Sequence, residues 1–291
     1  MKELVVVSGK GGTGKTSMVS ALASLSKNKV LCDADVDASD LHLIMHPQNK
    51  EDHEFFAGHV PRIDTQVCTQ CGLCKMNCRW HAIDDNFTID LIACEGCGVC
   101  YYICPEQAIL FDENKCGHWY IANSRFGHMV FAKLGIAEEN SGKLVTLVRQ
   151  EANKLAQQKQ LDFILTDGPP GIGCPVIASI GGATLVLIVT EPTIAGLHDL
   201  KRIIELTKHF KIPSRVCINK YDINLKMSQE IESTAEANDS KVIGKIPFDP
   251  FFTKAMVEGK TIFEYDPENS ICKTITTMWD CLWNEISESN N

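Results

Sequence analysis

The amino-acid sequence predicts an α/β protein, in which a mostly parallel sheet has helices on both faces and a small cysteine-rich α+β module is inserted. Three observations predict this fold. Strand-like apolar segments alternate with helical ones, the first strand runs into a glycine-rich loop, and eight of the 14 cysteines lie between Cys68 and Cys104. Strands that alternate with helices form parallel βαβ units, whose sheet is buried on both faces.

The elements of this sheet follow one another along the chain. Apolar runs of strand length indicate buried strands, and apolar residues at helical spacing indicate helices packed on them. A polar connector with a short strand at 54–57 covers residues 46–65, and the α/β pattern resumes at Trp119. Strands are predicted at residues 4–8, 29–33, 162–167, 183–190, 215–219 and 241–247, and helices at 15–26, 141–157 and 193–210.

The composition is that of an ordinary globular protein, with 291 residues, 44% hydrophobic and 22% charged. A net charge of −9 disfavours nucleic acid and anionic membranes as partners. Only four consecutive apolar residues precede the glycine-rich loop, so we expect no signal peptide. A cytoplasmic, reducing location follows, where clustered cysteines bind metals or carry out redox chemistry.

The segment Gly9–Thr16 follows the first strand and opens the first helix, which is the context that a phosphate-binding loop requires. Glycines let backbone N–H groups surround phosphate oxygens, and the helix N-terminus adds partial positive charge. Lys15 is expected to reach the β- and γ-phosphates, and the Thr16 hydroxyl is expected to bind Mg²⁺. The predicted nucleotide-binding residues here are Gly11, Gly12, Thr13, Gly14, Lys15, Thr16 and Ser17.

A second lysine in this loop, Lys10, makes the sequence resemble the deviant Walker A ATPases. This family includes MinD, ParA, the Mrp-type iron–sulfur carriers and the nitrogenase iron protein. The resemblance implies that Lys10 contacts the phosphates of a nucleotide held in a face-to-face dimer. An ATP-dependent homodimer is therefore expected.

Acidic residues follow two of the predicted strands. Asp35 is the candidate for positioning the attacking water, as in the switch I segment of the family, and spacing alone leaves Asp37 and Asp40 open for the same role. Asp167 ends an apolar strand, at the edge where parallel sheets bind ligands. It is expected to hold Mg²⁺ through water, with 168–173 as a mobile switch.

The sequence Asn219-Lys220-Tyr221-Asp222 follows another strand. In G proteins this pattern binds guanine through the aspartate, whereas the resemblance implies that Asn219 contacts adenine. Pro247 lies in a segment that resembles the family's base-flanking loop. ATP is favoured over GTP, and replacement of Asp222 by alanine is then expected to leave affinity unchanged.

The cysteines between residues 68 and 104 follow a 2-2-3 spacing that occurs twice. This spacing resembles bacterial two-cluster ferredoxins, in which the fourth ligand of each cluster comes from the other repeat. Zinc is the main alternative, and Arg79 departs from the proline that usually follows the fourth cysteine. The resemblance implies one 4Fe-4S cluster on Cys68, Cys71, Cys74 and Cys104, and a second on Cys78, Cys94, Cys97 and Cys100.

Cysteines outside this window are expected to pack as small apolar residues, as at Cys32 and Cys217. Cys174 remains open, because a helix is predicted to begin there and helix N-termini activate thiols. Apolar residues at helical spacing near the C-terminus predict a docked helix, and its acidic residues disfavour a membrane anchor.

These features predict an ATPase domain at residues 1–60 and 114–291, with a ferredoxin-like domain inserted at 61–113. The expected cofactors are ATP, Mg²⁺ and two 4Fe-4S clusters. The expected function is a slow, partner-stimulated ATPase that acts as a dimeric switch for electron transfer to a redox protein. Two alternatives are a carrier that delivers clusters to apo-proteins, and an ATP-driven positioning or assembly switch with structural clusters.

Overall fold

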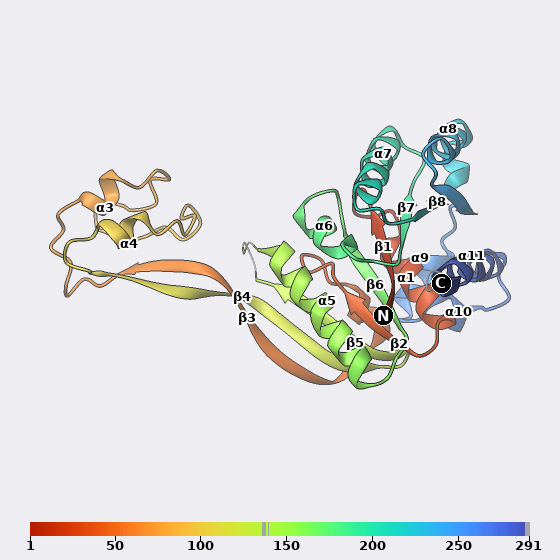
Figure 1. Ribbon diagram of the computed structural model, residues 1–291, viewed down its shortest axis with the longest axis horizontal. Helices are drawn as coiled ribbons and strands as arrows, with labels where there is room; N and C mark the ends of the chain where they lie inside the picture. Colours follow the sequence, from red (N-terminus) through yellow and green to blue (C-terminus); the bar gives the residue numbers. More distant parts are fainter. Residues whose placement is uncertain (136–137, 139, 289–291) are drawn as a thin grey trace. The chain divides into compact units, whose positions relative to one another are not determined.

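A computed structural model of the protein describes residues 1–135, 138 and 140–288. Its strands form one sheet in the order β3-β4-β5-β2-β6-β1-β7-β8-β9, so the α/β prediction is confirmed (Figure 1). The strands are β1 (Lys2–Ser8), β2 (Lys29–Asp33), β3 (Gln48–Ile63), β4 (Ile109–Ser124), β5 (Gly127–Leu134), β6 (Phe163–Pro170), β7 (Leu185–Thr190), β8 (Ser214–Asn219) and β9 (Lys241–Ile246).

The chain divides into two compact units. The larger unit comprises Met1–His53, Trp119–Lys133 and Ser141–Asn291, and the smaller comprises Glu54–His118 and Leu134–Asn140. The short helices α3 (Leu73–Met76) and α4 (Val99–Ile103) belong to the smaller unit. The larger unit contains α1 (Lys15–Leu25), α2 (Leu41–Met45), α5 (Ser141–Gln158), α6 (Cys174–Ile180), α7 (Ile194–His209), η1 (Tyr221–Ile223), α8 (Leu225–Glu236), α9 (Phe251–Val257), α10 (Ile262–Tyr265) and α11 (Ser270–Glu288).

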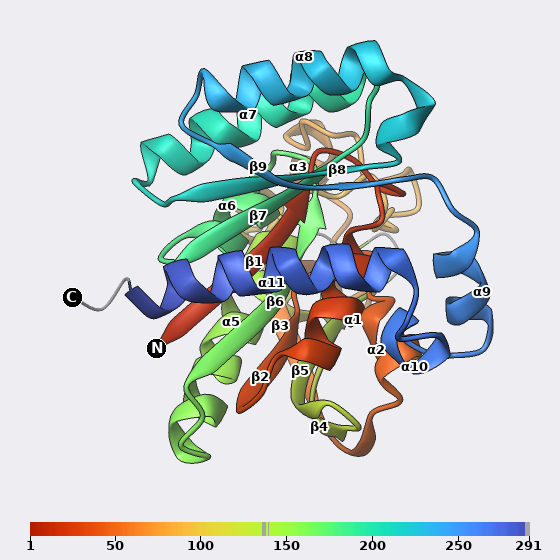
Figure 2. The same cartoon turned by 90° about the vertical axis from the view of Figure 1, so that its right-hand side faces the viewer.

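The parallel strands of the larger unit are buried on both faces by helices. Neighbouring side chains of one strand point in opposite directions, so they pack against different helices. In β1, Leu4 and Val6 pack with α1 and α11, whereas Val5 and Val7 pack with α6, α7 and α8. Figure 2 shows α11 lying across the sheet beside α1. The docked C-terminal helix is therefore confirmed. No described helix is long and apolar enough to span a membrane.

The sequence prediction differs most from the structure in the predicted polar connector, residues 46–65, and in the segments that pair with it. The short strand expected at 54–57 belongs to a 16-residue strand, β3, and neither the 16-residue β4 nor β5 was anticipated. Most β3 side chains are exposed and polar, so this segment has neither an apolar run nor a clear alternation. Its strand is formed by pairing with β4, a tertiary contact that composition does not reveal.

The smaller unit repeats its backbone at an interval of 26 residues. Asp64 and Asp90 accept hydrogen bonds from the N–H groups of Gln66 and Ile92, at 2.9 Å in each case. Left-handed conformations recur at the same interval and place equivalent turns in the two cysteine repeats. The paired positions are Gln70 and Gly96, Gly72 and Gly98, and His81 and Gln107.

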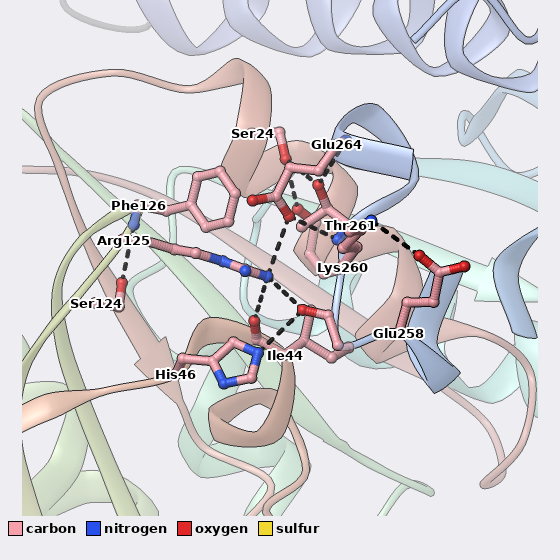
Figure 3. Close-up of polar contacts among 12 residues, drawn as sticks. Ser24, Ile44, His46, Ser124, Arg125, Phe126, Glu258, Lys260, Thr261 and Glu264 are labelled. Atoms are coloured by element: carbon pink, nitrogen blue, oxygen red, sulfur yellow. Dashed lines mark hydrogen bonds and ion pairs between the residues drawn. The ribbon is translucent and has the colours of Figure 1, made fainter. Parts of the chain in front are cut away.

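A polar junction anchors the β4–β5 turn of the larger unit (Figure 3). Arg125 donates from Nη2 to the carbonyls of Ile44, in α2, and Gly259, and it forms an ion pair with Glu264 of α10. Glu264 also completes a capping box with Thr261, whose hydroxyl accepts from Ser24 of α1. The turn is thereby held to α1, α2 and the segment that follows α9.

Candidate nucleotide site and cysteine cavities

The glycine-rich loop lies between β1 and α1, with its first helical residue at Lys15. Gly14 has a φ of +93°, and a Cβ there would lie 2.4 Å from Asn219 Nδ2. The same amide nitrogen donates to the Thr13 carbonyl at 2.7 Å. Glycine is therefore required at position 14, and Asn219 holds the loop in place.

Lys15 is buried among carboxylates at the C-terminal edge of the sheet. Its Nζ lies 2.5 Å from Asp167 Oδ1 and 3.2 Å from Asp35 Oδ2. Although burial lowers the pKa of Lys15, the charges of Asp167 and Asp35 outweigh it, and the pKa is raised above its ordinary value. The ammonium group is therefore held charged at the place where phosphates are expected.

Sequence reasoning missed a third carboxylate, Asp33, in this cluster. Asp33 on β2 is the register partner of Asp167 on β6, and it is fully buried. It accepts from the Ser39 hydroxyl at 2.8 Å and from the Asp35 N–H at 3.2 Å. Burial, followed by the charge of Asp167, raises the pKa of Asp33 well above its usual range. The signal was available, because Asp33 ends a predicted apolar strand.

The cluster has acceptor capacity to spare for a divalent cation. Two buried carboxylates, Asp35 and Asp167, contact the single ammonium group of Lys15, which leaves an excess of negative charge. Within the described residues, Asp35 Oδ1 and Asp167 Oδ2 are buried without a hydrogen-bond partner. Oxygen ligands of this kind suit Mg²⁺, which proteins bind through one or two carboxylates together with substrate phosphates and water. Asp37 and Asp40, the other two acids considered, are exposed.

Lys10 forms an ion pair with Glu191, the residue that follows β7. Lys220 lies 3.3 Å from the same carboxylate and donates to the Gly12 carbonyl at 3.1 Å. Burial raises the pKa of Glu191, but hydrogen bonds from Lys10 and Lys220 outweigh it and lower the pKa below its ordinary value. Glu191 was not singled out from the sequence, because one acid after a strand carries no pattern.

The loops expected to flank the base are joined by a hydrogen bond from the Phe248 N–H to Asp222 Oδ1, at 2.6 Å. Pro247 precedes this contact and Asn219 lies at the end of β8. Asp222 therefore supports the loop after β9 whichever base is bound. The expectation that its replacement leaves ATP affinity unchanged does not fit this geometry.

The remaining predicted nucleotide residues lie at the start of α1. Thr16 places its hydroxyl 3.5 Å from Lys15 Nζ. The Ser17 hydroxyl contacts the Met256 sulfur of α9 at 3.3 Å, so it faces a neighbouring helix. Gly11 and Gly12 are exposed at the loop tip.

Two cavities in the smaller unit are lined by cysteines, and each takes three cysteines from one repeat and one from the other. The sets are those that the ferredoxin resemblance implies. In the described part of the chain, no group of three or more His, Cys, Asp or Glu side chains is arranged to hold a metal ion. The first cysteine cavity is lined by Cys68, Cys71, Cys74 and Cys104, and the second by Cys78, Cys94, Cys97 and Cys100.

The two cavities share a pattern of N–H groups directed at sulfur. The N–H of Ala82 lies 3.4 Å from Cys78 Sγ, and the N–H of Ala108 lies 3.4 Å from Cys104 Sγ. Such donors stabilise thiolates that ligate a cluster. Ile83 and Ile109 form the buried core between the cavities, together with the Cys74 side chain.

The other cysteines differ from these eight. Cys32 and Cys217 are fully buried in β2 and β8, as predicted, and burial raises the pKa of Cys217 to about 12. Cys174 is exposed and is the first residue of α6. Its role stays a prediction.

Residues 4–262 match the family model of the CobQ/CobB/MinD/ParA nucleotide binding domain. The chain belongs to this family. An uncharacterized protein of Methanocaldococcus jannaschii is 31% identical over 283 residues, covering 96% of each chain. The solved structure of the septum site-determining protein MinD complexed with Mg-ADP from Pyrococcus horikoshii has the same fold. Its TM-score is 0.58 at 18% identity, and the match covers 97% of this chain and 95% of that one.

A third relative matches a shorter stretch. Pyruvate synthase subunit PorD of Methanothermobacter marburgensis is 36% identical over 55 residues, which is 19% of this chain and 68% of that protein. The region that matches the family model contains the glycine-rich loop, Lys15 and Asp167. Helix α11 lies outside that region.

Proposed function

We propose that the protein is a slow ATPase that dimerises with ATP and thereby controls electron transfer through two 4Fe-4S clusters in residues 61–113. The observation that carries this proposal is the pair of cysteine cavities. Each gathers four thiols from both repeats, in a chain whose family domain binds nucleotide. Four thiolates around one cavity suit a cubane cluster.

The nucleotide half of the proposal rests on an exchange of partners at Lys15. In the described structure, its ammonium group is bound to Asp167 and Asp35. When phosphates enter, Lys15 would turn to the β- and γ-phosphates, and the freed carboxylates would hold Mg²⁺ with Thr16. The Mg²⁺ ion supplies positive charge that stabilises the transferred phosphoryl group. Asp35 would orient the attacking water.

The dimer half rests on Lys10. In the described structure its ammonium group is bound to Glu191 of its own chain. By resemblance to deviant Walker A ATPases, it would contact the phosphates of a nucleotide across a dimer interface. Dimerisation then requires Lys10 to leave Glu191, which connects the nucleotide state to the association state.

The cluster half rests on cysteines, with backbone N–H groups of Ala82 and Ala108 donating to the thiolates that cross between repeats. The clusters supply one-electron redox chemistry. Relationship to a subunit of pyruvate synthase supports a partner protein as the source or recipient of electrons.

The test measures cluster oxidation with and without nucleotide. Anaerobic protein is reduced with dithionite, its clusters are followed by electron paramagnetic resonance, and their reoxidation is timed with ATP, ADP or neither. We expect ATP alone to change the rate, and Lys10→Ala to abolish the change. Lys10 is a better control than Lys15, because Lys15→Ala would leave buried carboxylates unpaired. Identical rates in all conditions would contradict gating.

A cluster-transfer experiment distinguishes the electron-transfer proposal from the alternative of a carrier that delivers clusters to apo-proteins. Incubation with an apo-ferredoxin should leave the iron on this chain, because four cysteines line each cavity and can supply all four ligands of a cluster. Rapid and complete transfer to the apo-protein would favour the carrier.

Asp35→Ala, which should retain bound ATP, then serves to capture the physiological partner from native cells.

A further inference from the structure

Large apolar side chains are exposed around the second cysteine cavity. Trp80 lines that cavity, as does Gly98. The Tyr102 ring lies beside Gly98, because a Cβ added at Gly98 would be 3.4 Å from it. Ile92 is 91% exposed and Tyr102 80% exposed. We call Trp80, Leu91, Ile92, Tyr101 and Tyr102 the apolar rim. Exposed apolar groups gathered in one place usually mark an interaction site.

The internal repeat shows that four of the five rim residues have polar counterparts at the first cavity, where only Met76 is apolar. Gln66 and Ile92 have the same hydrogen bond to the aspartate two residues earlier, so they occupy equivalent positions, yet one is polar and the other apolar. Each rim residue has a counterpart 26 positions away at the first cavity. The counterparts are Glu106 for Trp80, Thr65 for Leu91, Gln66 for Ile92, Lys75 for Tyr101 and Met76 for Tyr102. Two repeats with one backbone have therefore diverged in the surface that they present.

The segment that carries the rim is acidic overall, although Arg79 places its guanidinium over the Trp80 ring, 5.5 Å from the centroid. Residues 61–113 contain eight acidic and three basic side chains. Beside the rim, a polar cleft of about 290 Å³ is lined by Ile92, Glu95 and Glu138, among others. Glu95 also lines the second cysteine cavity. Two carboxylates in a cleft of this size fit a lysine or arginine side chain of a partner.

We propose that the apolar rim docks a basic electron-transfer protein and that the second cavity, not the first, is the point of electron exchange. This rests on the proposed function, because it requires a cluster in that cavity. The partner would cover the rim with an apolar centre and place a basic side chain in the cleft. Aromatic residues such as Trp80 and Tyr102 are the types that contribute most to binding energy.

Binding is tested with cytochrome c, a basic haem protein, as the probe. Calorimetric titration at low salt would compare the anaerobic wild type with the Ile92→Ser/Tyr102→Ser double variant and with Met76→Ser, the repeat-equivalent control for Tyr102. We expect about tenfold weaker binding for the double variant and less than about twofold for the control. Equal effects of both variants would overturn the proposal.

The acidic cleft has its own matched pair. Glu95→Gln should weaken binding by about threefold and reduce its salt dependence, whereas Glu106→Gln, at the first cavity, should not. Both substitutions remove one negative charge from the smaller unit, so a general charge effect would weaken both equally. That result would contradict docking at the second cavity.

Electron transfer provides a second readout. Protein reduced with dithionite and freed of the excess passes one electron to each ferric haem, which oxidises one cluster and reduces the haem iron. The double variant should slow this step about tenfold, while reduction of ferricyanide, a small acceptor that needs no docking, stays unchanged. Equal slowing with both acceptors would overturn docking in favour of altered clusters.

Failure of the proposed function gives a different result. If the clusters cannot be reduced, electron transfer is absent in every variant, yet the binding differences still decide whether the rim docks a basic protein. Sedimentation velocity of the protein alone tests whether a second copy of this chain occupies the rim. If the wild type self-associates and the double variant does not, a second copy of this chain covers the rim and the proposal is wrong.

Discussion

Asp33 and Asp167 are register partners on the adjacent parallel strands β2 and β6, so two buried carboxyl groups lie close together, and Asp167 contacts the Lys15 ammonium group. The sequence indicated Asp167 alone. Their proximity, together with burial, raises the pKa of Asp33. The negative charge of this site exceeds the positive charge of Lys15, so binding of a cation there is favourable.

The first prediction concerns Asp33→Asn. Because the native pKa of Asp33 is raised, the native state retains a proton that the unfolded chain releases, and stability falls as pH rises above the ordinary value of 3.8. At pH 7 the nucleotide-free variant should therefore be more stable than wild type, by about 1 kcal/mol. Thermal unfolding at several pH values checks this. The gain should shrink in acid, and Asp37→Asn, at an exposed position, should give none.

A companion measurement uses Mg-ADP. Asp33 lies beside Asp167 and accepts a hydrogen bond from the backbone of Asp35, the two carboxylates that we propose hold Mg²⁺, so ligand addition should stabilise Asp33→Asn less than wild type. An equal increase in melting temperature for both proteins would show that Asp33 does not contribute to ligand binding.

The second prediction concerns Lys29, which is buried and donates to the Ser26 carbonyl at 2.7 Å. Burial lowers its pKa from 10.5 to about 8. Between these values the unfolded chain binds more protons, so wild-type stability rises with pH there. Lys29→Met should raise the free energy of unfolding at pH 7 by about 1–2 kcal/mol. Denaturant unfolding should show this gain shrinking above pH 8, and exposed Lys27→Met is the control.

The third prediction concerns Glu191→Gln. Removal of the carboxylate charge frees Lys10 from its partner within the chain, so ATP should drive dimerisation at about threefold lower concentration. Sedimentation velocity across an ATP titration measures this. Glu205→Gln removes the same charge from an exposed position of α7 and should not alter the titration. A higher ATP requirement for Glu191→Gln would mean that Glu191 supports the dimer instead.

The fourth prediction separates the structural and base-reading roles of Asp222. Asp222→Ala removes the acceptor for the Phe248 N–H and should weaken ATP binding about fivefold. Asp222→Asn keeps an acceptor oxygen and should restore ATP affinity. Fluorescence titrations with ATP and GTP provide the measurement. Loss of a GTP preference in Asp222→Asn would instead identify a guanine-binding aspartate.

The fifth prediction concerns how the cysteines are shared between clusters. Cys78→Ser should remove about half of the iron. Adding Cys94→Ser should remove little more, because both residues line the second cavity, whereas adding Cys68→Ser should remove the rest. Iron analysis of the three proteins decides this. If each cluster used a single repeat, the double variant of Cys78 and Cys68 would keep half of the iron.

Predictions from the sequence were accurate where a pattern is local. The strand at 29–33 matches β2 in full, and the helix predicted from residue 15 begins there. Buried parallel strands are nearly continuous apolar runs, so a short run of this kind marks each one in the sequence. The ribbon of β3 and β4 was missed because most β3 side chains are exposed and the order of the ribbon comes from strand pairing.

The sequence by itself determined the α/β class, the glycine-rich loop with Lys10 and Lys15, and the doubled cysteine spacing, since each is written in consecutive residues. Only the tertiary structure decided which groups meet. It brought Asp33 beside Asp167 and Lys10 to Glu191, and it gave the second cysteine cavity an apolar rim. Contacts between residues distant in sequence depend on how strands align and loops close, and neither is encoded in any one segment.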